Sequence, residues 1–392
     1  MILRLPLILG LVLLLAGCVT RTAEPTRPGH TTLGSPLIIV PALKLGNYLL
    51  VEARWDRRGP YHFLVDTGSS TTLVTPELAA RYPGRNLPPG GMPPVRVRSA
   101  PGETALLPAT TIRRIELGEA RFEDVPVLVH DLRELSAHFG MKIDGILGFQ
   151  LFRETVMTLD YPQSRLLLQR PHPAPLHPGI ALPLDPARRA PFVRLKLGEQ
   201  EIDTLIDSGS DATLSLNLEG LTPDFAAPPR PGALVGTLTG DHLQQLGRWH
   251  APLRIGPYEI PSPVVDVTET FSSLGGGILR HFTVTFDQER NRVIFHRETH
   301  DPVALEIRRS SGLSFTRFPA YWRVAGVVPG SPAAAAGVQA GDLVTRINNE
   351  PVARWNFSRF EQLVAGVDEI RFRFLNGTRE TERVLPVFAP VP

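Results

Sequence analysis

A ten-residue phrase that occurs twice is the strongest constraint that this chain of 392 residues places on its own fold. Residues 64–73 read LVDTGSSTTL and residues 205–214 read LIDSGSDATL, so Asp66 and Asp207 occupy equivalent positions. An unpaired carboxylate at the end of an apolar strand costs free energy, so each acid should have an interaction partner or a functional role. The repetition predicts two related lobes, each carrying one of these acids at a strand end.

The repeat extends well beyond these phrases. A candidate hairpin precedes each acid, LLVEARW with YHFLV in the first copy and FVRLKL with EIDTLI in the second. After the acids, residues 147–160 (LGFQLFRETVMTLD) align without gaps with residues 274–287 (LGGGILRHFTVTFD). Alternating and β-branched segments predict a mainly β chain with short helices such as PELAARY, 76–82. We place the two β-barrel lobes at 37–171 and 176–300, joined by a proline-rich linker.

The last part of the chain follows a different pattern. The segments SSGLSFTR (310–317), GSPAAAAG (330–337) and AGDLVTRIN (340–348) together resemble a PDZ domain, which we place at 303–392 as a small α+β unit. The resemblance implies that the GLSF loop captures the C-terminal carboxylate of a peptide ligand. The alternative is an exposed strand edge without a ligand. The residues of this candidate site are Gly312, Leu313, Ser314 (in place of the second glycine of such loops) and Phe315.

The chemistry of two D-[ST]-G-S loops follows from their charges. If a pseudo-twofold axis brings Asp66 and Asp207 together, like charges oppose double ionisation, and the pair holds one proton over a wide pH range. One carboxylate can then act as general base on a water molecule while the other donates a proton to a substrate carbonyl. The glycine of each motif permits the tight turn and close backbone approach that this arrangement needs.

On these residues, the region 37–300 resembles a retropepsin- or pepsin-type aspartic protease with both lobes in one chain. A hydrophobic–hydrophobic–Gly element, Ile146-Leu147-Gly148, supports the resemblance, and Ser273-Leu274-Gly275 repeats it with one apolar residue changed to serine. The resemblance implies an endopeptidase with Asp66 and Asp207 as catalytic dyad and with no cofactor. It assigns supporting roles around that dyad to Thr67, Gly68, Ser69, Ser208, Gly209, Ser210, Gly148 and Gly275.

The same resemblance implies finer roles for several residues. Thr67 and Ser208 would brace the two lobes through backbone hydrogen bonds, and the hydroxyls of Ser69 and Ser210 would bond the carboxylates. Residues around Gly102 and Gly240 stand where such proteases have flap hairpins over the substrate. Neither flap candidate contains the tyrosine of pepsin-like flaps, which favours the retropepsin-like side. The chain also departs from the pattern at Asp211, an additional negative charge beside the second motif.

The N-terminus indicates a secreted, membrane-attached protein. The apolar run from Leu5 to Leu15 is short for a membrane span but suits the core of a signal peptide at 1–17. LAGC at 15–18 resembles the lipobox of bacterial lipoproteins, which implies lipidation of Cys18 and a flexible tether over 18–36. An ordinary signal peptide or a coincidental cysteine is the alternative. We expect a periplasm-facing lipoprotein of the cell envelope, in the outer membrane, because Val19 is not an aspartate.

Other classes of function find little support. A net charge of +2 without a basic block argues against nucleic acid, and a single cysteine excludes an intramolecular disulfide. His296 and His300 have helical spacing but follow a strand and have no further ligands nearby, so no metal site is expected.

Three alternatives remain open: two concern the function and one concerns how the dyad forms. The acids can be structural caps in an inactive scaffold that binds protein termini through its PDZ domain. The enzyme can be a processing protease with one physiological substrate. The dyad can also form between two chains, but tethering of the lobes favours a pair within one chain and therefore a monomeric catalytic unit.

Overall fold

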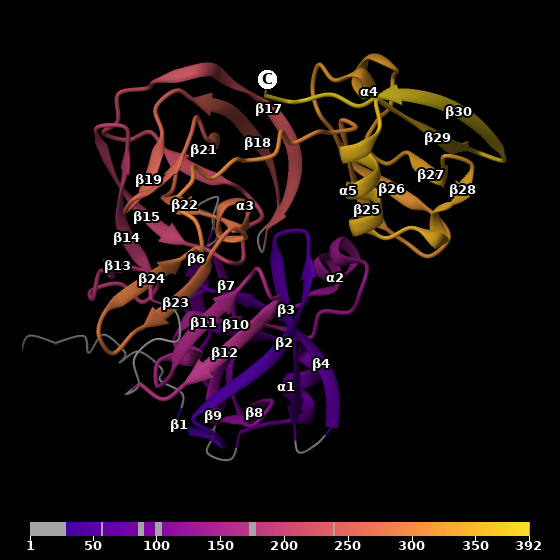
Figure 1. Ribbon diagram of the computed structural model, residues 1–392. Coiled ribbons are helices and arrows are strands. Elements are labelled where there is room, and N and C mark those ends of the chain that lie inside the picture. The colour runs from indigo at the N-terminus through magenta and orange to yellow at the C-terminus, as the bar shows by residue number, and fades with distance from the viewer. Residues whose placement is uncertain are drawn as a thin grey trace, which may run out of the picture.

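The computed structural model describes residues 29–55, 58–84, 90–98, 104–171, 178–237 and 240–391. As predicted, the chain is mainly β, and Figure 1 shows two β-rich halves in contact with a smaller C-terminal domain. The described strands form sheets of 13, nine, six and two strands. Within the described ranges, no helix is long and apolar enough to cross a membrane.

The first half contains the first D-[ST]-G-S phrase. In β3 the inward side chains of Val51, Ala53 and Trp55 are buried while Glu52 and Arg54 are exposed, which is the alternation expected of a half-buried strand. Its elements are β1(His30–Leu33), β2(Leu37–Leu45), β3(Tyr48–Trp55), β4(Arg58–Asp66), β5(Thr72–Val74), α1(Pro76–Arg81), β6(Val95–Arg98), β7(Thr104–Leu107), β8(Ala109–Leu117), β9(Ala120–Val129), α2(Arg133–Phe139), β10(Gly145–Gly148), a 3-10 turn at Phe149–Phe152, β11(Val156–Asp160) and β12(Arg165–Gln169).

The second half repeats the strands around the acid but, in its described residues, has no helix between β15 and β22, and its central hairpin is longer. That hairpin, β17–β18, carries three register shifts along its length. The elements are β13(Ile180–Pro183), β14(Phe192–Leu197), β15(Gln200–Ile206), β16(Leu214–Asn217), β17(Phe225–Thr237), β18(Gly240–Trp249), β19(Leu253–Ile255), β20(Tyr258–Ile260), β21(Val264–Thr268), β22(Ser272–Leu274), α3(Gly276–Leu279), β23(Thr283–Asp287) and β24(Arg292–His296).

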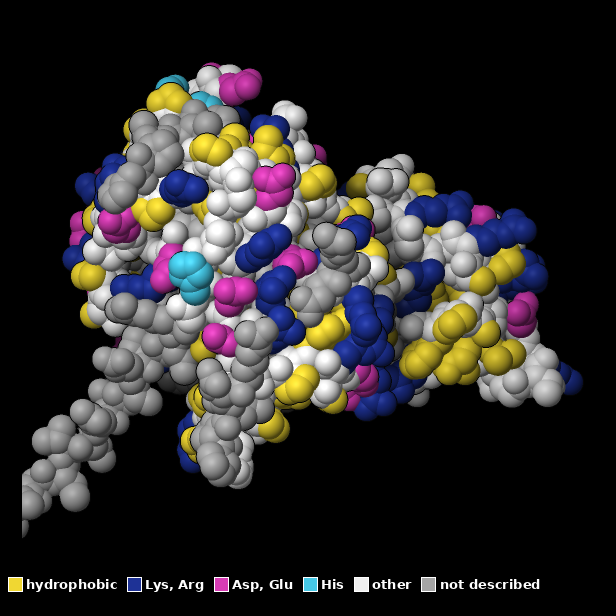
Figure 2. Space-filling view, turned by 90° about the horizontal axis from the view of Figure 1, so that it is seen from below, with side chains coloured by type: hydrophobic (Ala, Val, Ile, Leu, Met, Phe, Trp, Pro, Cys, Tyr) yellow, Lys and Arg dark blue, Asp and Glu magenta, His cyan; other side chains and the backbone are white. Residues whose placement is uncertain are grey.

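The C-terminal domain has its own core, built around Phe315, Trp322, Phe360 and Phe372. Its strand order is β25-β26-β27-β29-β30, so β25 is an edge strand. Figure 2 shows many Lys and Arg side chains over this domain, at the right of the view. The elements are β25(Leu313–Arg317), β26(Trp322–Val327), α4(Pro332–Ala335), β27(Leu343–Ile347), β28(Glu350–Pro351), a 3-10 turn at Val352–Arg354, α5(Phe357–Gly366), β29(Glu369–Asn376) and β30(Arg379–Pro386).

The two β-rich halves share one sheet at their junction. The repeated segments that the sequence aligns, β11 and β23, pair antiparallel with Thr158 opposite Thr285, and the two hydroxyl oxygens lie 2.9 Å apart. On either side of this centre, Asp160 accepts a hydrogen bond from Arg165 and Asp287 accepts one from Arg292. Equivalent strands therefore meet across a local twofold axis, which places the two motifs symmetrically.

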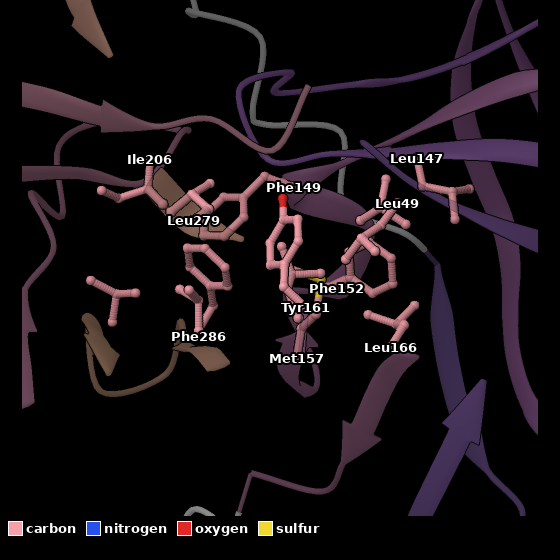
Figure 3. Close-up of a cluster of buried hydrophobic side chains, with 14 of the residues drawn as sticks. Leu49, Leu147, Phe149, Phe152, Met157, Tyr161, Leu166, Ile206, Leu279 and Phe286 are labelled. Atoms are coloured by element: carbon pink, nitrogen blue, oxygen red, sulfur yellow. The ribbon is translucent and has the colours of Figure 1, made fainter. Parts of the chain in front are cut away.

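The hydrophobic core also continues across the junction. One cluster contains residues from both halves and is built on fully buried side chains such as Phe152, Tyr161 and Phe282. In Figure 3, Ile206, Leu279 and Phe286 of the second half lie beside Phe149 and Tyr161 of the first. Phe149 and Phe286 make an edge-to-face contact with ring centres 5.4 Å apart. This shared core fixes how the two halves sit relative to each other.

Two expected boundaries differ from the structure. Residues 30–33, assigned to the flexible tether 18–36, form β1 and pair with the edge of β9, because Leu33 gains burial there. The sequence places the start of the C-terminal domain at residue 303, but Val303 packs into the core of the two β-rich halves and the domain's own first bridge joins Ser310 to Phe388. The signal peptide, Cys18, Gly102 and residues 172–177 of the linker lie outside the described residues.

Candidate active site

The two repeated acids lie at equivalent strand ends. Asp66 is the last residue of β4, and Asp207 directly follows β15. Beside each of these strands runs a parallel strand that ends in a glycine element: β10, with Gly148 opposite Asp66, and β22, whose Leu274 carbonyl accepts the Asp207 N–H at 2.9 Å. The structure therefore places Ile146-Leu147-Gly148 and Ser273-Leu274-Gly275 against the two acid-bearing turns.

Reciprocal hydrogen bonds join the two turns. The Thr67 N–H donates to Ser208 Oγ and the Ser208 N–H donates to Thr67 Oγ1, both at 3.0 Å. Each hydroxyl then donates onward to the opposite strand, Thr67 to the Ile206 carbonyl at 2.6 Å and Ser208 to the Val65 carbonyl at 2.8 Å. Both side chains are buried. We call these four bonds the brace. They hold the ends of β4 and β15 in a fixed relation.

The brace brings the carboxylates face to face. A methyl group on Gly68 would collide with the Asp207 carboxylate, and one on Gly209 would collide with that of Asp66. Each carboxylate therefore lies against the glycine of the opposite turn. Asp66 Oδ1 also accepts the Ser69 N–H at 3.0 Å, and Asp207 Oδ1 accepts the Gly209 N–H at 2.9 Å. Both acids belong to one chain, so the pair is complete without a second copy.

The two carboxyl groups differ in their proton affinity. Burial raises the pKa of both above the ordinary value of 3.8. The rise is larger at Asp207, where burial and then the charge of Asp66 oppose ionisation. At Asp66 the Ser69 N–H and the hydrogen bond with Asp207 act in the opposite direction and limit the rise in pKa. The pair therefore favours a state in which the two carboxyl groups together hold one proton and one negative charge.

The resemblance predicts that the hydroxyls of Ser69 and Ser210 bond the carboxylates, but both bond nearby backbone groups instead. The Ser69 hydroxyl donates to the Thr71 carbonyl at 2.7 Å, and Ser210 Oγ accepts the Ala212 N–H at 3.2 Å. A hydroxyl next to a tight turn finds a backbone partner at lower entropic cost than a more distant side chain. At Ser69, it is the backbone N–H that bonds the neighbouring acid.

The carboxylates open into a large cavity of about 1770 Å³ between the halves and the C-terminal domain. Hairpin β17–β18 lines it through Leu234, Val235 and Gln244. Gly240, the second flap candidate, begins β18 at the tip of this hairpin, opposite Thr237. The first half lines the cavity with an apolar cluster that includes Leu107 and Phe139.

The GLSF loop faces the same cavity. Leu313, Ser314 and Phe315 lie on the edge strand β25, and α5 lines the cavity beside them through Phe360 and Val364. Gly312 has a φ of +80°, a conformation that favours glycine. Ser314, the departure from the usual loop, accepts the Leu234 N–H of hairpin β17–β18 at 3.1 Å. This loop therefore contacts a hairpin that lines the same cavity as the acids.

Two residues near the acids gave no sequence signal of their own. Arg308 lies between the second half and the C-terminal domain and donates to Asp211 Oδ2 at 2.7 Å. Burial acts to raise the pKa of Asp211, but the charge and the hydrogen bond of this guanidinium act in the opposite direction, and that pKa is lowered. Tyr161 is fully buried, and burial and then the charges of Asp207 and Asp66 raise its pKa. An isolated arginine or tyrosine carries no motif, so only the fold could reveal these neighbours.

His296 and His300, both in the described part of the chain, do not form a ligand set. His296 Nδ1 lies 2.6 Å from the Pro178 carbonyl, whereas His300 stacks on Tyr258. In the described part of the chain, no group of three or more His, Cys, Asp or Glu side chains could hold a metal ion.

Comparison with protein families agrees with two parts of this description. Residues 51–151 match the family of aspartyl proteases, and residues 323–373 match the PDZ domain family. The chain therefore contains an aspartyl protease domain and a C-terminal PDZ domain. The first match covers Asp66 and Gly148 but not Asp207. No curated protein matches the sequence.

Proposed function

We propose that this protein is an aspartic endopeptidase of the bacterial cell envelope whose catalytic dyad is Asp66 and Asp207. The observation that carries the proposal is the brace, which holds two acids of one chain face to face at the base of a large cavity. Structural caps would need neither a shared proton nor access to a cavity. The aspartyl protease match around Asp66 adds independent support.

The proposed mechanism uses the one proton that the two acids share. Ionised Asp66 acts as general base on a water molecule between the carboxyl groups, and protonated Asp207 donates to the carbonyl oxygen of the scissile peptide bond. The attack yields a tetrahedral gem-diol without a covalent enzyme intermediate. Return of a proton to the leaving nitrogen releases two peptides. Hairpin β17–β18 lies where it can hold an extended substrate over the dyad.

The PDZ domain adds a second contact for protein substrates or partners. Its edge strand β25 and helix α5 form the groove in which PDZ domains take up peptides by strand addition. Because this groove and the dyad line one cavity, a peptide bound to the domain lies close to the site of cleavage. Lipidation of Cys18 would fix the whole assembly to the outer membrane, facing the periplasm. A Cys18→Ala variant should then leave the membrane fraction.

The direct test is cleavage of a peptide library by the soluble protein from Val19 onward, at about pH 3–8. We expect wild-type protein to cut and Asp66→Asn and Asp207→Asn each to lose about 10²–10⁴-fold in rate. A folded wild-type protein that cuts no peptide would contradict the proposal. That result would favour an inactive scaffold, and capture of C-terminal peptides by the GLSF loop would then be measured.

A further inference from the structure

The strand registers around the two acids identify equivalent positions in the two halves. In the first half, Ile146 of β10 pairs with Leu64 of β4 and with Leu73 of β5, and Leu73 pairs with Leu128 of β9. Residues paired in this way present their side chains to the same face of a sheet. These four residues form a continuous rung, which we call the first rung.

The second half has the corresponding rung. Ser273 of β22 pairs with Leu205 of β15 and with Ser215 of β16, and Ser215 pairs with Asp266 of β21. We call these four residues the second rung. Leu64 and Leu205 each stand two residues before the repeated acid, so both rungs lie on the same strand face as the carboxylates, about 7 Å away along the strand. All eight residues line the cavity.

The two rungs differ in chemistry at three of their four positions. The first rung consists of aliphatic side chains, all of them buried. In the second rung, three of the four positions carry a hydroxyl or a carboxylate: Ser273, Ser215 and Asp266. Ser273 is buried and Ser215 and Asp266 are half-buried. Polar groups withdrawn from water cost free energy unless they find a partner. The change from an apolar residue to serine at 273 is therefore accompanied by polar residues at two neighbouring positions of the same rung.

The described residues leave the charge of Asp266 without a cation. Its Oδ1 accepts the Gln245 N–H at 2.9 Å and its Oδ2 lies 3.3 Å from Gln244 Nε2. Both donors are neutral, and no salt bridge to Asp266 exists in the described part of the chain. Nor do the Ser215 and Ser273 hydroxyls have a hydrogen-bond partner there. Burial raises the pKa of Asp266, and the neighbouring His242, on the same hairpin as Gln244, opposes this rise only in part. The acid and both hydroxyls face the cavity without strong partners.

We propose that the second rung is a specificity pocket for a lysine or arginine side chain next to the scissile bond. Successive side chains of an extended peptide point to opposite sides, so the two residues flanking the bond reach opposite halves. The first rung then takes a bulky apolar residue and the second takes the basic one, paired with Asp266 and bonded by the hydroxyls. The inference rests on the proposed function and adds the chemical class of the substrate.

The test measures binding, so it does not depend on turnover. The probes are octapeptides in which a hydroxyethylene group replaces the scissile amide, with leucine on one flank and either lysine or norleucine on the other, in both orientations. In one orientation, the probe with lysine should bind the full-length protein about tenfold more tightly than the probe with norleucine. The reason is that a partly desolvated charge pair is stronger than an exposed one. Asp266→Asn should remove most of this ratio, and Ser273→Ile, which copies the first rung, should reduce it.

The exposed Asp224 provides the matched control, since Asp224→Asn removes a carboxylate that does not line the cavity and should leave the ratio unchanged. Equal or tighter binding of norleucine in both orientations would overturn the inference, as would an Asp266→Asn variant with the wild-type ratio. Either result is compatible with cleavage at other sequences, so the proposed function would survive. Failure of every probe to bind, together with no cleavage by wild type, would overturn both.

Discussion

At the scale of single residues, Asp207 departs strongly from an ordinary carboxyl side chain. Its folded-state pKa lies well above 3.8, so the folded protein binds more protons than the unfolded chain between these two values. Stability therefore falls as pH rises through this window. We expect Asp207→Asn to raise the melting temperature at pH 7 by a few degrees, where 1 kcal/mol corresponds to about 2–4 °C. The gain should disappear below about pH 4, near the ordinary value.

Thermal unfolding followed by circular dichroism from about pH 3 to pH 8 checks this expectation, with the exposed Asp224→Asn as control. A destabilised Asp207→Asn variant at neutral pH would contradict the assigned direction of the pKa shift. So would a gain that is the same at every pH.

The two acids should also fail to act independently. If one proton is shared, removing either carboxyl group removes the whole proton-transfer unit, and a second removal costs little more. We expect the Asp66→Asn/Asp207→Asn double variant to lose no more than about a further twofold in kcat/KM relative to the weaker single variant. A loss of kcat/KM in the double variant equal to the product of the two single losses would show that the acids contribute separately. That result would argue against a shared proton.

At the scale of elements, the brace should be needed for both stability and rate. Thr67→Val keeps the shape but leaves the Ser208 N–H and the Ile206 carbonyl buried without their partner, at about 1–3 kcal/mol for each group. Thr67→Ser keeps the hydroxyl and is the matched control. Urea unfolding gives the stability, and kcat on one cleaved peptide gives the rate. A stable and fully active Thr67→Val would show that the brace does not position the acids.

The strands themselves were largely predictable, but their register was not. The hairpins around both acids and helix α1 appear where alternation and the PELAARY phrase placed them. The sequence aligns Leu73 with Leu214, whereas the ladders equate Leu73 with Ser215, one residue further on. An extra residue in one turn changes which side chains face the cavity. This one-residue shift can be read only from the hydrogen-bonded strand pairs. The second rung therefore could not be found from the repeat alone.

At the scale of the whole molecule, Arg308 connects parts that the sequence treats as separate. It pairs with Asp211 of the second half, and its charge also acts on Glu361 of α5 in the PDZ domain. Composition and motifs predicted three domains but gave no sign of how they dock, because docking depends on single contacts such as this one and Ser314 with Leu234.

Reversing this charge should loosen the PDZ domain. Arg308→Glu repels Asp211 and Glu361 together, and we expect a larger radius of gyration in small-angle X-ray scattering. Asp211→Arg combined with Arg308→Glu restores the attraction and should restore the wild-type radius. Single ion pairs contribute about 0–1 kcal/mol when exposed, so the change should be partial. An unchanged radius in Arg308→Glu would show that other contacts hold the domain.

The central claim is that two acids of one chain share a catalytic proton. Its most direct measurement is the pH dependence of kcat/KM for one cleaved peptide, at about pH 3–8. The account predicts a bell-shaped profile, because activity needs one carboxyl group ionised and the other protonated. The falling limb should lie well above the ordinary carboxyl value of 3.8, because burial and the charge of Asp66 raise the pKa of Asp207. A rate that changes in one direction only, or cleavage that survives in Asp66→Asn, would contradict it.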